Sequence, residues 1–361
     1  MENSIVEKIH LSDWRGVFYV TGGGSLLLSD LLTVPGASAT VLDARIPYAG
    51  AALEEATHQE LVQACSSTAA QTLAMQAFLK ARELDSHRHL FGLGVTASLA
   101  TNREKKGRLR AYIALQTASK TQVSELVFSR DTSRMEQEQL LAETSLRKLA
   151  SGLSIKDSLK ASGSDRVANA TEPISRLLGE KSCFVGNPHS VFLPGAFNPL
   201  HRGHRRMKEM AEQFCGAKVQ YELCVRNIDK PPLDFLEIER LGVQFSKDEL
   251  VLTNVPKLRD KATLLAPSGN AIFVVGVDTL LRVVDPSYYR DEDELESTLD
   301  LFYSRNDRFL VFGRTIEDRR FVTLDDMEIP ENLRHICVGF TERQFRMDIS
   351  STEIRLRSSE D

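Results

Sequence analysis

The sequence predicts an α/β protein of two domains, each a β-sheet layered with helices. Its 361 residues exceed the roughly 150 that one average domain uses. Runs with strand character alternate with helical runs in both halves of the chain, which is typical of α/β folds. A stretch rich in Ser, Gly, Lys and Asp, residues 151–168, separates the two patterns. We therefore expect a first domain over 1–150, a connector over 151–189 with a short helix near 173–178, and a second domain over 190–361.

The first domain shows four strands and three helices in its pattern. A strand over 17–20 ends in the glycine-rich turn 21–25, and a helix follows over 26–32. Residues 53–83 are rich in Ala, Leu and Gln and lack Gly and Pro, which predicts one long helix. Strands are expected over 90–95, 110–116 and near 125–129, and an amphipathic helix over 133–149 closes the domain.

The second domain has at least five expected strands, with a helix over 201–213 after the first. The strands are predicted over 191–193, 219–225, 271–275, 309–312 and 336–339. Five strands with intervening helices favour a doubly wound, Rossmann-like parallel sheet, whose ligands bind at the carboxyl ends of the strands. Residues just after these strands are therefore the first candidates for a site.

Composition excludes several classes of protein. With 45 Lys and Arg against 50 Asp and Glu, the net charge is −5, so we expect no nucleic-acid partner. The longest uncharged run, 61–79, is too polar for a membrane span, so we expect no membrane partner, and the N-terminus lacks a secretory pattern. Five cysteines without a CxxC pair indicate the cytoplasm or another reducing compartment.

The segment that carries chemistry runs from Gly195 to His204, after a predicted strand and into a predicted helix. The small Gly195 would let a ligand approach the backbone. Amides at a helix N-terminus favour an anion. His201 and His204, three apart, share one helical face. The pattern predicts a phosphate site with two imidazole donors; zinc would need further ligands, and no Cys or other His is near in sequence.

A second segment, 349–355, stands near the C-terminus. Ser350, Ser351 and Thr352 place three hydroxyls at an expected helix start, beside backbone amides without partners. Arg355, one turn later, can bind phosphate oxygens through its guanidinium fork. The hydroxyls could also cap the helix, and a cap can serve both purposes.

Together the two segments resemble the nucleotidylyltransferase superfamily, with the HxGH and ISSTxIR signatures, over about 190–361. The resemblance implies transfer of a nucleotidyl group from a nucleoside triphosphate to a phosphate acceptor, with release of pyrophosphate. It implies that His201 and His204 hold the triphosphate near its α-phosphate, while Ser351, Thr352 and Arg355 hold the departing phosphates. Mg²⁺ is expected on the nucleotide oxygens, mostly hydrated, without a protein-caged metal site.

The ISSTxIR form is similar to the adenylyltransferases of nicotinamide or nicotinate mononucleotide, which implies ATP as donor and a role in NAD biosynthesis. The segment 276–280 is similar to their GxDxL segment, which implies that Asp278 faces the nucleotide. The loop 229–232 is loosely similar to one that supplies a phosphate-binding lysine, here Lys230. Another acceptor, CTP as donor, ATP hydrolysis, and a non-catalytic nucleotide sensor or scaffold stay open. The nucleotide-binding residues expected from the motifs are Gly195, Ala196, Phe197, Asn198, Lys230, Gly276, Asp278, Ser350, Ser351 and Thr352.

The first domain resembles the C-terminal domain of the CinA family, which includes nicotinamide mononucleotide deamidases, over about 10–150. The match lies in 21–23, 32–38 and 92–96. The family signature E-S-C-T-G-G has Phe18 in place of its acid and Tyr19 in place of its serine. Deamidation needs an activated nucleophile or water, so we expect no deamidase activity. Nucleotide binding, regulation or homo-oligomer formation is the expected role.

Overall fold

The computed structural model divides the chain into two compact units. Unit 1 comprises residues 1–175 and 228–239, and unit 2 comprises 176–227 and 240–361. The structure describes the chain apart from residues 1–3, 104–105, 157–162, 227–230, 316–319 and 359–361. Within the described ranges no helix is long and apolar enough to cross a membrane.

Unit 1 is built on a six-stranded sheet of order β2-β1-β3-β4-β5-β6. β1 pairs in parallel with β2 and β3, and the pairings from β3 to β6 are antiparallel. The strands are β1 Arg15–Thr21, β2 Val41–Arg45, β3 Leu90–Ser98, β4 Arg110–Thr117, β5 Lys120–Val127 and β6 Ser164–Asn169. The helices are α1 Ile5–His10, α2 Ser25–Thr33, α3 Ala37–Thr40, α4 Gly50–Thr57, α5 Ser67–Leu84 and α6 Arg134–Gly152.

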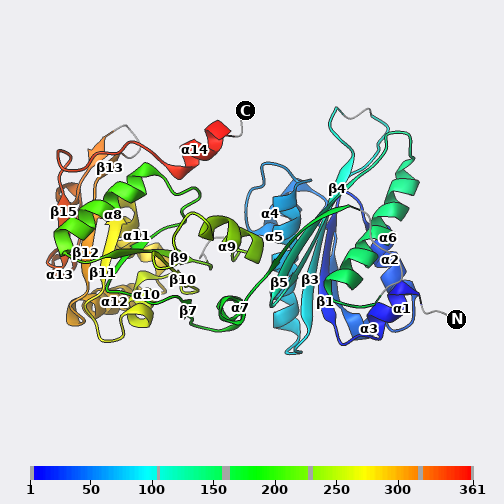
Figure 1. Cartoon of the computed structure of the whole chain (residues 1–361), viewed down its shortest axis with the longest axis horizontal. Coiled ribbons are helices and arrows are strands. Elements are labelled where there is room, and N and C mark those ends of the chain that lie inside the picture. The colour runs from blue at the N-terminus through cyan, green and yellow to red at the C-terminus, as the bar shows by residue number, and fades with distance from the viewer. Residues whose placement is uncertain (1–3, 104–105, 157–162, 227–230, 316–319, 359–361) are drawn as a thin grey trace. The chain divides into compact units, whose positions relative to one another are not determined.

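Helices cover both faces of this sheet: α5 lies on one side and α2 and α6 on the other (Figure 1). The α5 face depends on two glycines of β3. A Cβ at Gly92 would lie 2.2 Å from the Ala74 carbonyl oxygen, and one at Gly94 would lie 2.3 Å from that of Ala70. The helix therefore rests directly on the strand backbone. The opposite face holds the main apolar core, with Phe18 and Phe91 edge to face at 5.4 Å.

Unit 2 is built on a seven-stranded sheet of order β15-β12-β11-β8-β9-β10-β7, parallel except for the β10–β7 pair. Its strands are β7 Phe184–Val185, β8 Val191–Pro194, β9 Val219–Cys224, β10 Leu250–Thr253, β11 Ile272–Gly276, β12 Arg308–Phe312 and β15 Cys337–Phe340, with the separate hairpin β13 Arg314–Thr315 and β14 Phe321–Val322. The helices from α7 onward are α7 Glu172–Gly179, α8 Arg202–Cys215, α9 Phe235–Gly242, α10 Leu258–Leu265, α11 Val277–Val284, α12 Glu292–Ser304, α13 Glu331–Arg334 and α14 Ser351–Ser358, with 3₁₀ turns at Pro286–Tyr288 and Leu324–Asp326.

The strand order of unit 2 changes direction at β8. After β8 the chain builds β9 and β10 on one side, and it then returns to build β11, β12 and β15 on the other. Such a switch point leaves a crevice at the carboxyl ends of the two flanking strands, where ligands of doubly wound sheets bind. The ends of β8 and β11 therefore frame the candidate site.

The two faces of this sheet differ in character. On the α8 face, Tyr221 of β9 lies beneath Lys208, whose ammonium is 5.2 Å from the ring centroid. On the opposite face, α10 and α12 pack over the main apolar core. There the buried Glu222 of β9 accepts a 2.6 Å hydrogen bond from Lys261 of α10. Burying this charge is compatible with folding because it is paired.

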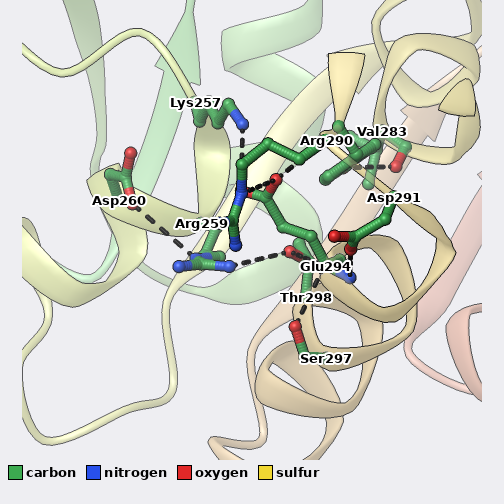
Figure 2. Close-up of polar contacts among 10 residues, drawn as sticks. Lys257, Arg259, Asp260, Val283, Arg290, Asp291, Glu294, Ser297 and Thr298 are labelled. Carbon is green, nitrogen blue, oxygen red and sulfur yellow. Dashed lines mark hydrogen bonds and ion pairs between the residues drawn. The ribbon is translucent and has the colours of Figure 1, made fainter. Parts of the chain in front are cut away.

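A polar cluster joins α10 to the start of α12 (Figure 2). The carboxylate of Glu294 accepts hydrogen bonds from Lys257 at 3.2 Å and from the Arg290 backbone amide at 2.9 Å. These hydrogen bonds lower the pKa of Glu294 to about 2, and the bond from the Arg290 amide has the largest effect. Asp291 caps α12 by accepting from the Glu294 amide. The cluster fixes α12, and its three cations and three anions balance in charge, so it supports the fold; they are Lys257, Arg259, Arg290, Asp260, Asp291 and Glu294.

The predicted helix over 53–83 is wrong in its middle. His58, with φ 52°, ends α4, and Ser66 caps α5 by accepting from the Ala69 amide. The predicted connector also contains the strand β6, which the sequence analysis missed. This edge strand consists mostly of exposed residues and has no apolar alternation that could reveal it. Its expected short helix corresponds to α7. Residues 228–239, expected in the second domain, cluster with unit 1.

Candidate functional site

The candidate site lies at the carboxyl end of β8, where the loop 195–201 leads into α8. The sequence predicts Gly195 as a point of ligand approach, but the structure gives it another role. A Cβ there would lie 2.7 Å from the Phe197 ring. That ring is buried against His204, Tyr221 and Phe245, so Phe197 supports the loop and can face a ligand only through its backbone, at φ 46°. Ala196, between them, is exposed.

His201 and His204 lie together, as their spacing predicts. Their rings stack with centroids 3.7 Å apart and planes at 19°. The His201 amide donates to His204 Nδ1 at 3.4 Å, which places the proton of a neutral His204 on Nε2. Burial first, then the charges of His201 and Arg314, lower the pKa of His204 to about 3. Burial and Arg314 also lower the pKa of His201. Both rings are therefore neutral at pH 7 and act as hydrogen-bonding groups rather than cations.

One ring nitrogen of His201 lacks a hydrogen-bond partner in the part of the chain that the structure describes. Its Nδ1 is buried and has no hydrogen-bond partner among the described residues. Buried polar atoms in proteins are nearly always paired, so an orphan at a candidate site points to a missing ligand or solvent partner. Gly203 leaves room for this ring, because a Cβ there would lie 3.1 Å from the His201 ring and from Ile349.

The C-terminal segment meets this loop directly. Ser351 donates to the Pro199 carbonyl at 3.0 Å, and Arg355 donates to the Asn198 carbonyl at 2.6 Å. Ser350 accepts from the Glu353 amide and so caps α14. The Ser351 hydroxyl proton is thus used in the hydrogen bond to Pro199, whereas the Ser350 hydroxyl can still donate to another acceptor. The two predicted segments are brought together as expected.

Two side chains that the motifs did not mark hold the same loop. The Gln244 amide group accepts from the Leu200 backbone and donates to the Phe197 carbonyl, at 2.7 and 2.9 Å. Arg240 donates to the Asn198 side chain at 3.0 Å. Arg240 lies in α9 and Gln244 two residues after its end, in a stretch for which the sequence predicted no element. Only tertiary structure places them beside the loop.

Asp278 lies just beyond β11, at the neighbouring strand end. Gly276 makes room for it, because a Cβ there would lie 2.6 Å from Asp278 Oδ1. Arg314 Nη1 donates to Asp278 Oδ2 at 3.2 Å. Arg314 was not predicted, although it follows the expected strand 309–312 at a carboxyl end. That position was the signal that could have found it.

Two predicted site residues cannot be assessed from the structure. Lys230 lies outside the described residues, and of Thr352 only the backbone, in α14, is described. No group of three or more His, Cys, Asp and Glu side chains suited to a metal ion occurs in the described part of the chain. The His201–His204 pair is thus not joined there by further zinc ligands.

The glycine-rich turn of unit 1 has a structural explanation. Gly22 and Gly24 adopt φ 75° and 97°, which favour glycine. The Gly24 amide, at the start of α2, donates to the buried Glu138 carboxylate at 2.7 Å. The protein's own carboxylate therefore occupies the anion position at this helix N-terminus. Tyr19, at the position expected for a nucleophile, is buried, and burial raises its pKa.

Comparison with known proteins finds a named relative for part of the chain. No protein-family model matches the chain. Over 204 residues the chain is 26% identical to a protein of Schizosaccharomyces pombe named "Putative nicotinamide mononucleotide adenylyltransferase", an alignment that covers 53% of this chain and 78% of that protein.

Solved structures similar to part of the chain come from the CinA group. The competence/damage-inducible protein CihA from Agrobacterium tumefaciens is 17% identical, with a TM-score of 0.32 over 43% of this chain and 98% of that one. A CinA superfamily protein from Klebsiella pneumoniae is 12% identical, with a TM-score of 0.34 over 42% and 93%.

Proposed function

We propose that unit 2 transfers the adenylyl group of ATP to a mononucleotide phosphate, nicotinamide or nicotinate mononucleotide, and releases pyrophosphate. One observation carries the proposal: two segments about 150 residues apart in sequence meet at the switch point of the sheet, through Ser351 with Pro199 and Arg355 with Asn198. Two imidazoles, the start of α14 and a guanidinium therefore lie on the same loop or in contact with it. These are groups that bind phosphate.

The reaction needs positioning and charge stabilisation more than covalent chemistry. An oxygen of the acceptor phosphate attacks the α-phosphorus, the bond from that phosphorus to the bridging oxygen breaks, and pyrophosphate leaves with the electron pair. His204, neutral and protonated at Nε2, donates a hydrogen bond to phosphate oxygens. Arg355 and the Ser350 hydroxyl stabilise the charge that develops on the departing phosphates.

The site fits ATP that carries Mg²⁺, since such a complex brings most of its metal ligands as water and phosphate oxygens. The buried orphan Nδ1 of His201 supports a phosphate or water partner. Asp278 is the carboxylate at the edge of the site that could contact the hydrated ion. Bound magnesium would neutralise part of the phosphate charge.

Nicotinamide mononucleotide as acceptor is supported by the Schizosaccharomyces pombe relative, which is named for that substrate. For unit 1 we propose a binding or assembly role without deamidase activity, supported by the buried Tyr19 and by Glu138 in the turn. Light scattering of the intact chain would test whether it forms a homo-oligomer.

The test is pyrophosphate release from ATP and Mg²⁺, with and without nicotinamide mononucleotide, for wild type and His201→Ala. The variant should lose about 10²–10³-fold in turnover, as when one transition-state donor is removed. His335→Ala removes an exposed imidazole and should keep wild-type turnover. A panel with CTP and other phosphate acceptors covers the alternatives. Full activity in His201→Ala would contradict the assignment of the site.

A further inference from the structure

Arg314 is an unassigned cation at the edge of the candidate site. Gly276 at the end of β11 pairs in register with Phe312 at the end of β12. Asp278 and Arg314 each lie two residues beyond this pair, so their side chains meet above the neighbouring strand ends, 3.2 Å apart. The fold therefore places the guanidinium at the carboxyl edge of the sheet, the same edge from which the β8 loop leaves.

The backbone of Arg314 is held from two sides. It belongs to β13, which pairs with β14, and Gly313 before it allows the Phe321 ring to approach, since a Cβ there would lie 2.5 Å from that ring. Thr315 after it donates to Asp348 at 2.6 Å. Asp348 directly precedes the C-terminal segment. Arg314 is thus tied by its backbone to the same segment that meets the histidine loop.

The side chain, in contrast, is free to exchange partners. Arg314 and Asp278 are 45% and 42% exposed, and an ion pair this exposed contributes little to stability. A guanidinium can bind two phosphate oxygens at once, with shorter and stronger hydrogen bonds than neutral donors make. Exchange of a solvated carboxylate for phosphate is therefore favourable.

The charge balance of the site calls for such a cation. His201 and His204 are neutral, so they offer hydrogen bonds without charge. The positive charge of Arg314 lowers the pKa of both imidazoles, and Arg314 follows β12, whose neighbour β11 lies beside β8. Arg355 is a second permanent cation, and it binds the loop itself through the Asn198 carbonyl.

We infer that Arg314 binds the phosphate chain of the nucleotide beyond the α-phosphate, and that Asp278 holds it in place until the nucleotide arrives. The inference rests on the proposed nucleotide site, and it adds a residue that sets affinity for triphosphates. The competing interpretation is that Arg314 only fixes the β13–β14 hairpin.

Equilibrium binding of ATP and of adenosine, each with Mg²⁺, to the full-length protein separates the two interpretations. Arg314→Gln should weaken ATP binding about 10–100-fold, as expected for loss of a hydrogen bond between charged groups. Adenosine binding should stay within about twofold, because it has no phosphate to lose. Arg314→Lys keeps the charge but loses the forked guanidinium, so its affinity for ATP should lie between those of wild type and Arg314→Gln.

Arg320→Gln is the matched control, because Arg320 is also an exposed arginine paired to an aspartate, Asp326 at 2.8 Å. It should bind ATP as wild type does, and both Gln variants should melt at the same temperature. ATP binding unchanged in Arg314→Gln, equal losses for ATP and adenosine, or a lower melting temperature for Arg314→Gln than for Arg320→Gln would overturn the inference. If the wild-type protein binds ATP but forms no dinucleotide, that result contradicts the proposed reaction but not the inference about Arg314.

Discussion

His204 is held as a neutral imidazole by its surroundings. Its ring is partly covered, stacks on His201, and has the positive Arg314 nearby, and each of these disfavours a second proton. A base with a lowered folded-state pKa binds fewer protons in the folded state than in the unfolded state between about pH 3 and the ordinary value of 6.5. Folding stability therefore rises with pH across that window, and it falls on acidification.

Replacing His204 should weaken this acid sensitivity. His204→Asn keeps an acceptor near the position of Nδ1 but cannot titrate. Between pH 6 and 4, wild type should lose about 1 kcal/mol more stability per pH unit than the variant, since one proton per unit corresponds to about 1.4 kcal/mol. Calorimetry at pH 6, 5 and 4 measures it, with His335→Asn as the exposed control. Parallel pH profiles for wild type and His204→Asn would mean that His204 is not shifted.

At the residue scale, the sequence predicts groups whose role depends on local spacing. The stacked pair His201 and His204 is of this kind. Arg240, Gln244 and Arg314 are not, because their roles come from contacts with residues 36 to 47 positions away in sequence. Local pattern cannot encode such contacts.

Among the elements, α5 and β3 of unit 1 depend on each other most closely. The helix packs on the strand at the two points where β3 has no side chain, Gly92 and Gly94. Backbone atoms of the helix would meet any Cβ there, and backbone cannot yield as a flexible side chain can. These glycines are required by packing, whatever ligand unit 1 binds.

Gly94→Ala should therefore lower the free energy of unfolding of unit 1 by about 3 kcal/mol, the upper range for overpacking. Gly50→Ala is the matched control, since nothing lies within 4 Å of a Cβ at Gly50 in α4, and it should be neutral or slightly stabilising. Trp14, the chain's single tryptophan, packs against the unit 1 core, so urea unfolding followed by its fluorescence reports on this unit. Equal midpoints for the two variants would refute the packing argument.

Element predictions succeed where apolar periodicity is strong. All five predicted strands of the second domain are present, as β8, β9, β11, β12 and β15. The strands that were missed, β2, β6, β7, β10, β13 and β14, are short or mostly exposed and carry little pattern. The break between α4 and α5 is set by His58 and Ser66, whose conformations the composition of 53–83 does not reveal.

For the whole molecule, chain topology decides what the site is made of. The switch point at β8 and the return of the C-terminal segment bring together residues that are about 150 positions apart. The rule that ligands bind at strand ends predicts this meeting from the sequence. It does not predict that residues 228–239 belong to unit 1, where the Phe235 amide donates to Thr121 and Asp234 accepts from Gln71.

The most direct test uses ATP that is labelled at either the α- or the γ-phosphate. The protein is incubated with this ATP, Mg²⁺ and nicotinamide mononucleotide, and the product that carries each label is identified. Adenylyl transfer predicts that the α-label enters a dinucleotide and the γ-label leaves as pyrophosphate, and that both depend on the acceptor. Release of the γ-label as inorganic phosphate, at the same rate with and without acceptor, would contradict the central claim and identify unit 2 as an ATP hydrolase.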